Sequence, residues 1–185
     1  MNHRALHLQV CFLVLFVAGG VARAQEPRLP ANIRGLSVNY KNGSLLVSFR
    51  VEGAFSPPVL EKLASASAVK FVHKIRVVRR RGLFGRTLDQ KTVETTARYD
   101  NLTRQYALDR AVDGTSVESR TTDSDAEMRR FMTEVHDLPV GDRETLSGEE
   151  HILVKVRSEY EDTWLLFLFP WTYHAEGEKA VDLKP

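Results

Sequence analysis

Ser67-Ala68-Val69-Lys70 has the Ser-x-x-Lys spacing, in which a lysine can activate a serine nucleophile. That chemistry requires both residues on the first turn of a buried helix. Here the stretch lies where a predicted helix ends and a predicted strand begins. No Lys-Thr-Gly or Ser-Asp-Asn segment accompanies it, so we interpret the match as chance.

The histidines and acids do not form a metal-binding pattern. Beyond the N-terminal segment the histidines are His73, His136, His151 and His174, and none belongs to a His-x-x-x-His pair. His73 falls on the apolar face of a predicted strand, as a half-buried, hydrogen-bonded histidine would. Asp123, Asp125 and Glu127 open a predicted helix, where acids favour the helix dipole, and the glycine of a calcium loop is missing. We predict no metal and no other cofactor.

The basic arm, residues 70–86, is the strongest candidate for a binding site. It has no acid before Asp89, and its tip is Gly82-Leu83-Phe84-Gly85. One interpretation is a solvated hairpin whose charges prevent edge-to-edge aggregation. The other is docking, in which the tip enters a lipid interface or a partner's pocket while the arginines bind phosphates or carboxylates. The candidate docking residues are Arg76, Arg79, Arg80, Arg81, Leu83, Phe84 and Arg86.

The N-terminal segment predicts export. Residues 1–24 combine a basic start, an apolar run too short to span a membrane, and a small-x-small ending at Ala22-Arg23-Ala24. We expect a cleaved signal peptide and a periplasmic protein. Cys11 is the only cysteine, so the mature chain has no disulfide. Cleavage also removes Arg4, Arg23 and no acid, which cancels the formal charge of +2 and argues against a nucleic-acid partner.

The positions that must carry these residues read mostly as strands. Alternating apolar residues predict strands at about 33–40 and 44–53, joined at Asn42-Gly43, which favours a tight hairpin turn. Ser56-Pro57 opens a short helix, and a long strand from Val69 to Val77 returns at about 87–99. The stretch RYDNLTRQYAL fits an N-glycosylation pattern. We interpret it as a polar turn between two strands, because Asp and Asn bond the nearby backbone.

A second helix begins at the capping box formed by Ser124 and Glu127. Apolar residues at helical spacing predict that it runs to Pro139: Met128, Phe131, Met132, Val135 and Leu138. Another strand begins at Ile152. We expect the apolar stretch from Trp164 to Trp171 to be a strand that completes the core, and the alternative is an exposed interaction edge. We expect one α+β domain over 33–171, a mainly antiparallel sheet or sandwich built from hairpins with two short helices packed on it. A lead-in (25–32) precedes it and a polar tail (172–185) follows it.

Three stretches resemble a bacterial exported family catalogued as domain of unknown function 4390. They are the segment from "SVNYKNGSLLVSFRVEGAF" through "VHKIRVVRRR", then "RYDNLTRQYAL", then a capped helix followed by "HILVKVR". The chain departs from the family pattern at Ala66-Ser67-Ala68 and at Leu83-Phe84. The resemblance implies an exported protein, sometimes encoded near a membrane sensor kinase, and carries no catalytic signature.

Three functions are compatible with these patterns. The favoured hypothesis is a non-enzymatic periplasmic binding or adaptor module that docks through the basic arm on a membrane protein, such as a sensor kinase, or on an anionic membrane surface. The second is a carrier of an apolar ligand, with a pocket lined by residues such as Phe71, Phe131 and Trp164. The third is a hydrolase whose catalytic triad the sequence does not reveal; loss of a measured activity on changing Ser67 or His73 would support it.

Overall fold

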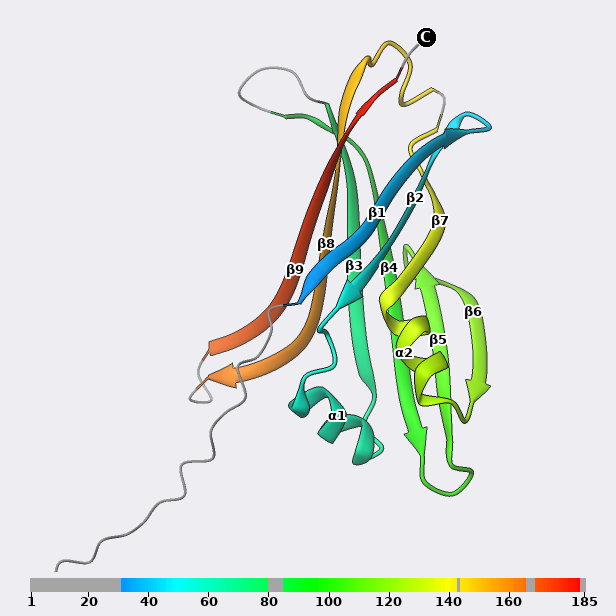
Figure 1. Ribbon diagram of the computed structural model, residues 1–185, viewed down its shortest axis with the longest axis vertical. Helices are drawn as coiled ribbons and strands as arrows, with labels where there is room; N and C mark the ends of the chain where they lie inside the picture. The colour runs from blue at the N-terminus through cyan, green and yellow to red at the C-terminus, as the bar shows by residue number, and fades with distance from the viewer. Residues whose placement is uncertain (1–30, 80–84, 143, 166–168, 184–185) are drawn as a thin grey trace, which may run out of the picture.

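The computed structural model describes residues 31–79, 85–142, 144–165 and 169–183, with the side chains of 161–172 left aside. They form two antiparallel sheets and two short helices, which confirms the predicted fold class (Figure 1). The smaller sheet has the order β1-β2-β7: β1 Asn32–Lys41, β2 Ser44–Glu52 and β7 Glu134–Val140. The larger has the order β6-β5-β4-β3-β8-β9: β3 Val69–Arg79, β4 Thr87–Asp100, β5 Gln105–Val112, β6 Thr115–Thr122, β8 His151–Leu165 and β9 Phe169–Asp182. The helices are α1 Pro57–Ala64 and α2 Asp125–Thr133.

Both predicted hairpin turns are confirmed. Asn42 and Gly43 join β1 to β2 with positive φ values of 52° and 81°, the conformation that Asn-Gly tolerates best. Asp100 ends β4, and its Oδ1 accepts the backbone N–H of Leu102 at 2.8 Å. The hydrogen bonds from the backbone N–H groups of Leu102 and Thr103 hold the pKa of Asp100 below its usual value. RYDNLTRQYAL is therefore two strand ends and an Asp-stabilised turn.

The second helix is shorter than predicted. Ser124 caps α2 as expected, since its Oγ accepts the N–H of Glu127 at 3.3 Å, but α2 ends at Thr133. Val135 and Leu138 belong to β7, opposite Phe49 and Val47 of β2. A bulge at Asp137, with φ 47°, places them on one face although they are three residues apart. That spacing imitates a helix, so the prediction that the helix reaches Pro139 is wrong.

The C-terminal segment also differs from the expected polar tail. Residues beyond 171 continue β9, which pairs with β8 as far as Asp182 opposite His151. Only one face of β9 is covered, so its alternation of polar residues with Ala175, Gly177 and Val181 reads as polar overall. The sheet therefore extends past the domain boundary expected at 171.

The core lies between the two sheets and under the helices. The smaller sheet crosses in front of the larger one, α1 covers its lower end, and α2 lies in front of β4 and β5 (Figure 1). Fully buried side chains from both layers meet there, including Leu45, Val47, Phe71, Ile75, Val154 and Met132. Within the described residues, no helix has the length and apolar character needed to cross a membrane.

Gly177 marks the closest approach of β9 to β1. A Cβ built on it would lie 2.9 Å from Cβ and 3.0 Å from Cγ2 of Ile33. We expect Gly177→Ala to lower the free energy of unfolding by about 1–3 kcal/mol, because Ile33 must shift. Urea unfolding measures this loss. The control is Glu178→Ala, on the opposite face of the same strand, with an expected change below about 0.5 kcal/mol. Equal stability of both variants would contradict the close approach.

Candidate functional site

The basic arm is the β3–β4 hairpin, and the structure describes its stem. Arg76 and Arg79 lie on β3, and Arg86 directly precedes β4. Arg80, Arg81, Leu83 and Phe84 lie outside the described residues, so the predicted docking tip stays a prediction.

The fold supplies acids to several cations of the arm. Lys70 pairs with Glu94 of β4, and Lys74 Nζ lies 2.8 Å from Glu159 Oε2 of β8. The hydrogen bond from Lys74 lowers the pKa of Glu159. Arg79 binds Glu149 with two nitrogens, and its Nε lies 2.7 Å and 2.9 Å from the two carboxylate oxygens. Arg79 thus anchors the loop before β8 and is not free for a partner.

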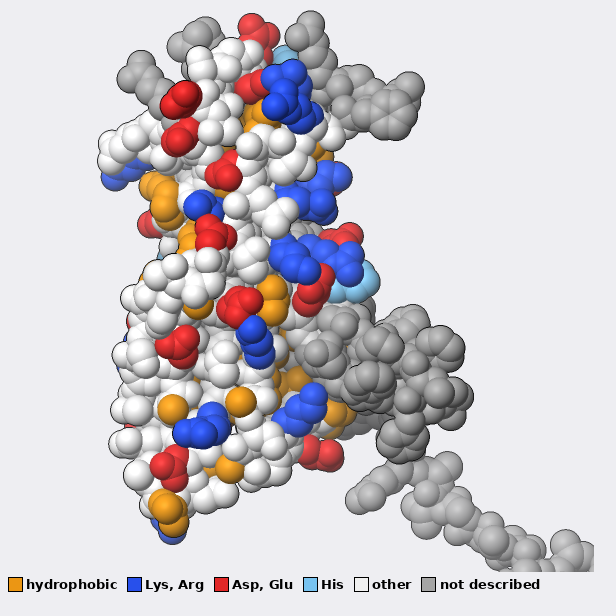
Figure 2. Space-filling view, turned by 180° about the vertical axis from the view of Figure 1, so that it is seen from behind, with side chains coloured by type: hydrophobic (Ala, Val, Ile, Leu, Met, Phe, Trp, Pro, Cys, Tyr) orange, Lys and Arg blue, Asp and Glu red, His pale blue; other side chains and the backbone are white. Residues whose placement is uncertain are grey.

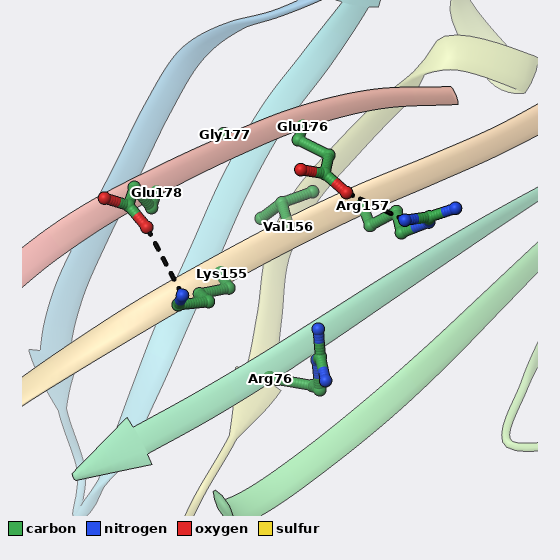
Figure 3. A pocket seen from close by; sticks show the side chains of 7 residues that line it. All are labelled: Arg76, Lys155, Val156, Arg157, Glu176, Gly177 and Glu178. Carbon is green, nitrogen blue, oxygen red and sulfur yellow. Dashed lines mark hydrogen bonds and ion pairs between the residues drawn. The ribbon is translucent and has the colours of Figure 1, made fainter. Parts of the chain in front are cut away.

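Arg76 differs from these cations. It is exposed on the outer face of β3, and within the described part of the chain it has no ion pair. It lines a shallow hollow of about 260 Å³ with Lys155 and Arg157 of β8 (Figure 3). β3 and β8 pair with Arg76 opposite Lys155, which brings these cations together. Arg86 is also exposed and without an ion pair among the described residues, at the upper end of the stem.

Carboxylates rim the far side of the hollow. Arg157 Nη1 lies 2.9 Å from Glu176 Oε1, and Lys155 Nζ lies 3.6 Å from Glu178 Oε2. Figure 3 shows these two pairs bridging β8 and β9, with the Arg76 guanidinium apart from them. Two of the three cations are therefore compensated. The Arg76 fork remains available for a carboxylate or phosphate group, which an arginine can bind with two parallel hydrogen bonds.

His73 is buried in the core. It is 0 % exposed, its Nδ1 lies 2.8 Å from Ser158 Oγ, and its Nε2 lies 3.1 Å from the carbonyl oxygen of Met132. A carbonyl can only accept, so Nε2 carries the proton and Nδ1 accepts from the serine. Burial lowers the pKa of His73 to about 4. The histidine is hydrogen-bonded as predicted, and more deeply buried than expected.

The serine–histidine pair resembles half of a catalytic triad, but its placement is structural. Ser158 is 1 % exposed, so a substrate cannot reach its Oγ in this conformation. The Ser-x-x-Lys residues are also separated. Ser67 follows α1 and hydrogen-bonds Ser65 Oγ at 3.0 Å, whereas the Lys70 ammonium pairs with Glu94. These positions agree with the interpretation of that match as chance.

The aromatic residues expected to line a carrier's pocket lie in two places. Phe71 is 1 % exposed and packs against Phe55 and Tyr160. Phe131, at the end of α2, lies under the guanidinium groups of Arg110 and Arg120, at 4.4 Å and 5.0 Å. The two rings do not share any of the three described hollows. The side chain of Trp164 lies outside the described residues.

Sequence reasoning missed the contributions of Lys155, Arg157 and Arg110. The alternation Lys155-Val156-Arg157 indicated only a strand with a polar face. Nothing local shows that this strand lies beside β3 rather than beside its sequence neighbours. Arg76 and Lys155 are 79 positions apart in the sequence, and only the folded sheet brings them opposite each other.

Comparison with known proteins gives a family and no function. A family model described as "Domain of unknown function (DUF4390)" matches residues 29–165. No curated protein and no solved structure matches the chain.

Proposed function

The chain belongs to the family of the Domain of unknown function (DUF4390), and we propose that it is a non-enzymatic binding module that docks on the periplasmic part of a membrane protein. The docking surface is the stem of the basic arm together with the hollow around Arg76. The partner supplies a carboxylate or another anionic group that the Arg76 fork binds.

The observation that carries the proposal is an uncompensated arginine in a hollow whose other two cations, Lys155 and Arg157, are paired with acids. Lys70, Lys74 and Arg79 have acid partners inside the chain, whereas Arg76 has none among the described residues. A guanidinium in a hollow between β3 and β8 can bind a planar anion with good geometry and partial desolvation. This makes Arg76 the natural contact for an external acid.

The charge pattern of the outer sheet face favours a protein partner over an anionic membrane. Figure 2 shows basic and acidic side chains interspersed over this face. Glu176 and Glu178 line the same hollow as Arg76 and would be repelled by an anionic lipid surface. A folded partner can place opposite charges against each of these groups. A wrong partner would place like charges against them, and the repulsion would weaken its binding.

Export is a premise of the proposal. The predicted signal peptide, residues 1–24, lies outside the described residues. We propose cleavage after Ala24 and a periplasmic location. Cell fractionation, followed by sequencing of the mature N-terminus, tests this premise separately from docking: Gln25 is the expected first residue.

Docking is tested with a photo-crosslinking residue at Gln90, which is exposed and pairs with Arg76 across the β3–β4 ladder. In the living cell we expect it to capture one membrane protein. Arg76→Glu should reduce capture about tenfold or more, because it replaces an attractive contact by a repulsive one. The measurement is the yield of the adduct by immunoblotting, with mass spectrometry to identify the captured molecule.

Two matched controls accompany this test. The same crosslinker at Gln105 lies on the far end of the sheet, opposite Asp100, and should capture no membrane protein. Arg98→Glu reverses an exposed arginine of β4 away from the hollow and should leave capture at Gln90 unchanged. Lipid adducts alone would replace the protein partner by the membrane surface. Equal capture with and without Arg76→Glu would exclude the Arg76 hollow as the docking surface.

A further inference from the structure

Among the described residues, β6 and β9 are the edge strands of the larger sheet, and each pairs with one neighbour only. β6 pairs with β5 only, and in the part of the chain that the structure describes nothing lies along its other side (Figure 1). An unpaired strand side presents backbone N–H and C=O groups to solvent and can pair with a strand from another chain.

The other sheet edges are covered or blunted. β9 and β1 lie side by side at Gly177 and Ile33, so that corner of the two sheets closes on itself. β7 carries Pro139, which cannot donate a backbone hydrogen bond, and the bulge at Asp137. A proline and a bulge both hinder pairing with a strand of another chain. β6 has a register shift at its start but contains no proline.

β6 has the composition of a strand that accepts a neighbour. Its sequence, TSVESRTT, contains no proline and no lysine, and most of its side chains are exposed. Val117 is 57 % exposed. A register shift lies between Arg110 and Ala111 of β5, at the start of β6, and the pairing from Glu118 to Thr122 is regular. At least five consecutive residues thus form a regular ladder with an open side.

We propose that β6 pairs with β6 of a second copy of this chain, antiparallel, about a twofold axis that passes between the two Ser119 residues. This register sets Glu118 opposite Arg120 of the second copy and Arg120 opposite its Glu118. Antiparallel residues directly opposite each other lie on the same face, so both pairs form on the side of α2. The strand is therefore complementary in charge to itself.

The side chains needed for these contacts are accessible. Arg120 and Glu118 are 41 % and 40 % exposed, and Arg120 Nε lies 3.5 Å from Glu118 Oε1 within the chain. Arg120 Nη1 also lies 3.0 Å from Glu127 Oε1. A second copy joins this network without leaving a buried charge unpaired. The contact is small, so we expect a weak dimer with a dissociation constant in the micromolar range or above.

A disulfide test is straightforward because Cys11 is the only natural cysteine and can be replaced. In a Cys11→Ser background the chain has no thiol, and Ser119→Cys introduces one at the twofold axis. Residues directly opposite in an antiparallel pair have Cα atoms about 4.5–5.5 Å apart, within disulfide range. Under mild oxidation we expect a cross-linked dimer, seen on non-reducing gels, with unchanged circular dichroism.

Thr121→Cys is the matched control. Thr121 is exposed like Ser119 and lies on the same face of β6. In the proposed register its counterpart lies four residues away along the strand, about 13 Å, beyond disulfide reach. We expect at least about tenfold less cross-linking at 121 than at 119, because the two thiols lie too far apart to bond. Equal cross-linking at both positions, or none at 119, would overturn the proposal.

Charge exchange provides a second test that does not depend on thiols. Arg120→Glu places acids opposite acids, and Glu118→Arg places bases opposite bases, so each variant alone should dimerise about tenfold more weakly. Mixing the two variants should restore association, because every opposing pair then attracts. Sedimentation equilibrium measures the three states, and thermal melts confirm that each variant is folded. Association that is unaffected by either variant, or not restored by mixing, would contradict this register.

Discussion

Acidification from pH 7 to pH 4 is expected to remove about 3 kcal/mol of stability through His73 alone. The pKa of His73 is lowered to about 4 in the folded protein, mainly by burial, against 6.5 in the unfolded chain. Below pH 6.5 the imidazole of His73 binds a proton in the unfolded chain but stays neutral in the folded protein until the pH approaches 4. Stability therefore falls as the pH drops from about 6.5 to about 4, and this contribution levels off below that range.

The measurement is urea unfolding at half-unit pH intervals. Carboxylates such as Glu159 and Asp142, whose pKa values are lowered, lose their contributions only below their ordinary values near 4. The loss between pH 6.5 and 4.5 therefore reports mainly on the histidine. The control is His73→Gln, whose amide can still donate to the Met132 carbonyl but does not titrate. It should be less stable at pH 7, with a nearly flat profile in this window. The same steep profile in the variant would exclude His73 as the cause.

Arg110→Ala is expected to lower the free energy of unfolding by about 3 kcal/mol. Arg110 Nη2 donates to the carbonyl oxygens of Phe131 at 2.8 Å and Glu134 at 3.3 Å, at the end of α2. The guanidinium also covers the Phe131 ring. Burial lowers the pKa of the group, so these hydrogen bonds compensate a desolvated charge. Alanine would leave the carbonyls unpaired and the ring uncovered.

Arg129→Ala is the matched control for Arg110. Arg129 lies over the Phe55 ring at 4.6 Å and pairs with Asp125, but it makes no hydrogen bond to a helix carbonyl. Its removal should cost about 1 kcal/mol, the value of an exposed ring contact with an exposed ion pair. Urea unfolding of both variants separates the contributions. Similar losses would show that the carbonyl hydrogen bonds of Arg110 add little.

Arg110 and His73 together explain why α2 ends where it does. Its last carbonyls face the larger sheet, where Arg110 binds that of Phe131, and both His73 and Thr95 bind that of Met132. A helix leaves its final carbonyls without partners inside the helix, so buried donors from β3 and β4 and a half-buried donor from β5 satisfy them. The chain can then turn into β7 without exposing unpaired backbone to the core.

The sequence alone determined the local elements whose chemistry lies in neighbouring residues. Asn42-Gly43 predicted a hairpin because few other pairs accept positive φ at both positions, and Asp100 predicted a turn because its side chain bonds the adjacent backbone. Ser124 and Glu127 marked the start of α2 for a similar reason. The antiparallel fold class followed from these short connections.

Only the tertiary structure decided which cations of the basic arm are paired with acids and where α2 ends. The arm contains no acid between Lys70 and Arg86, yet Glu149 and Glu159 reach Arg79 and Lys74 because β8 and the loop before it lie beside β3. The spacing of Val135 and Leu138 fits a helix and a bulged strand equally well, and pairing with β2 selects the strand. Both outcomes depend on contacts between residues more than 65 positions apart, which local patterns do not encode.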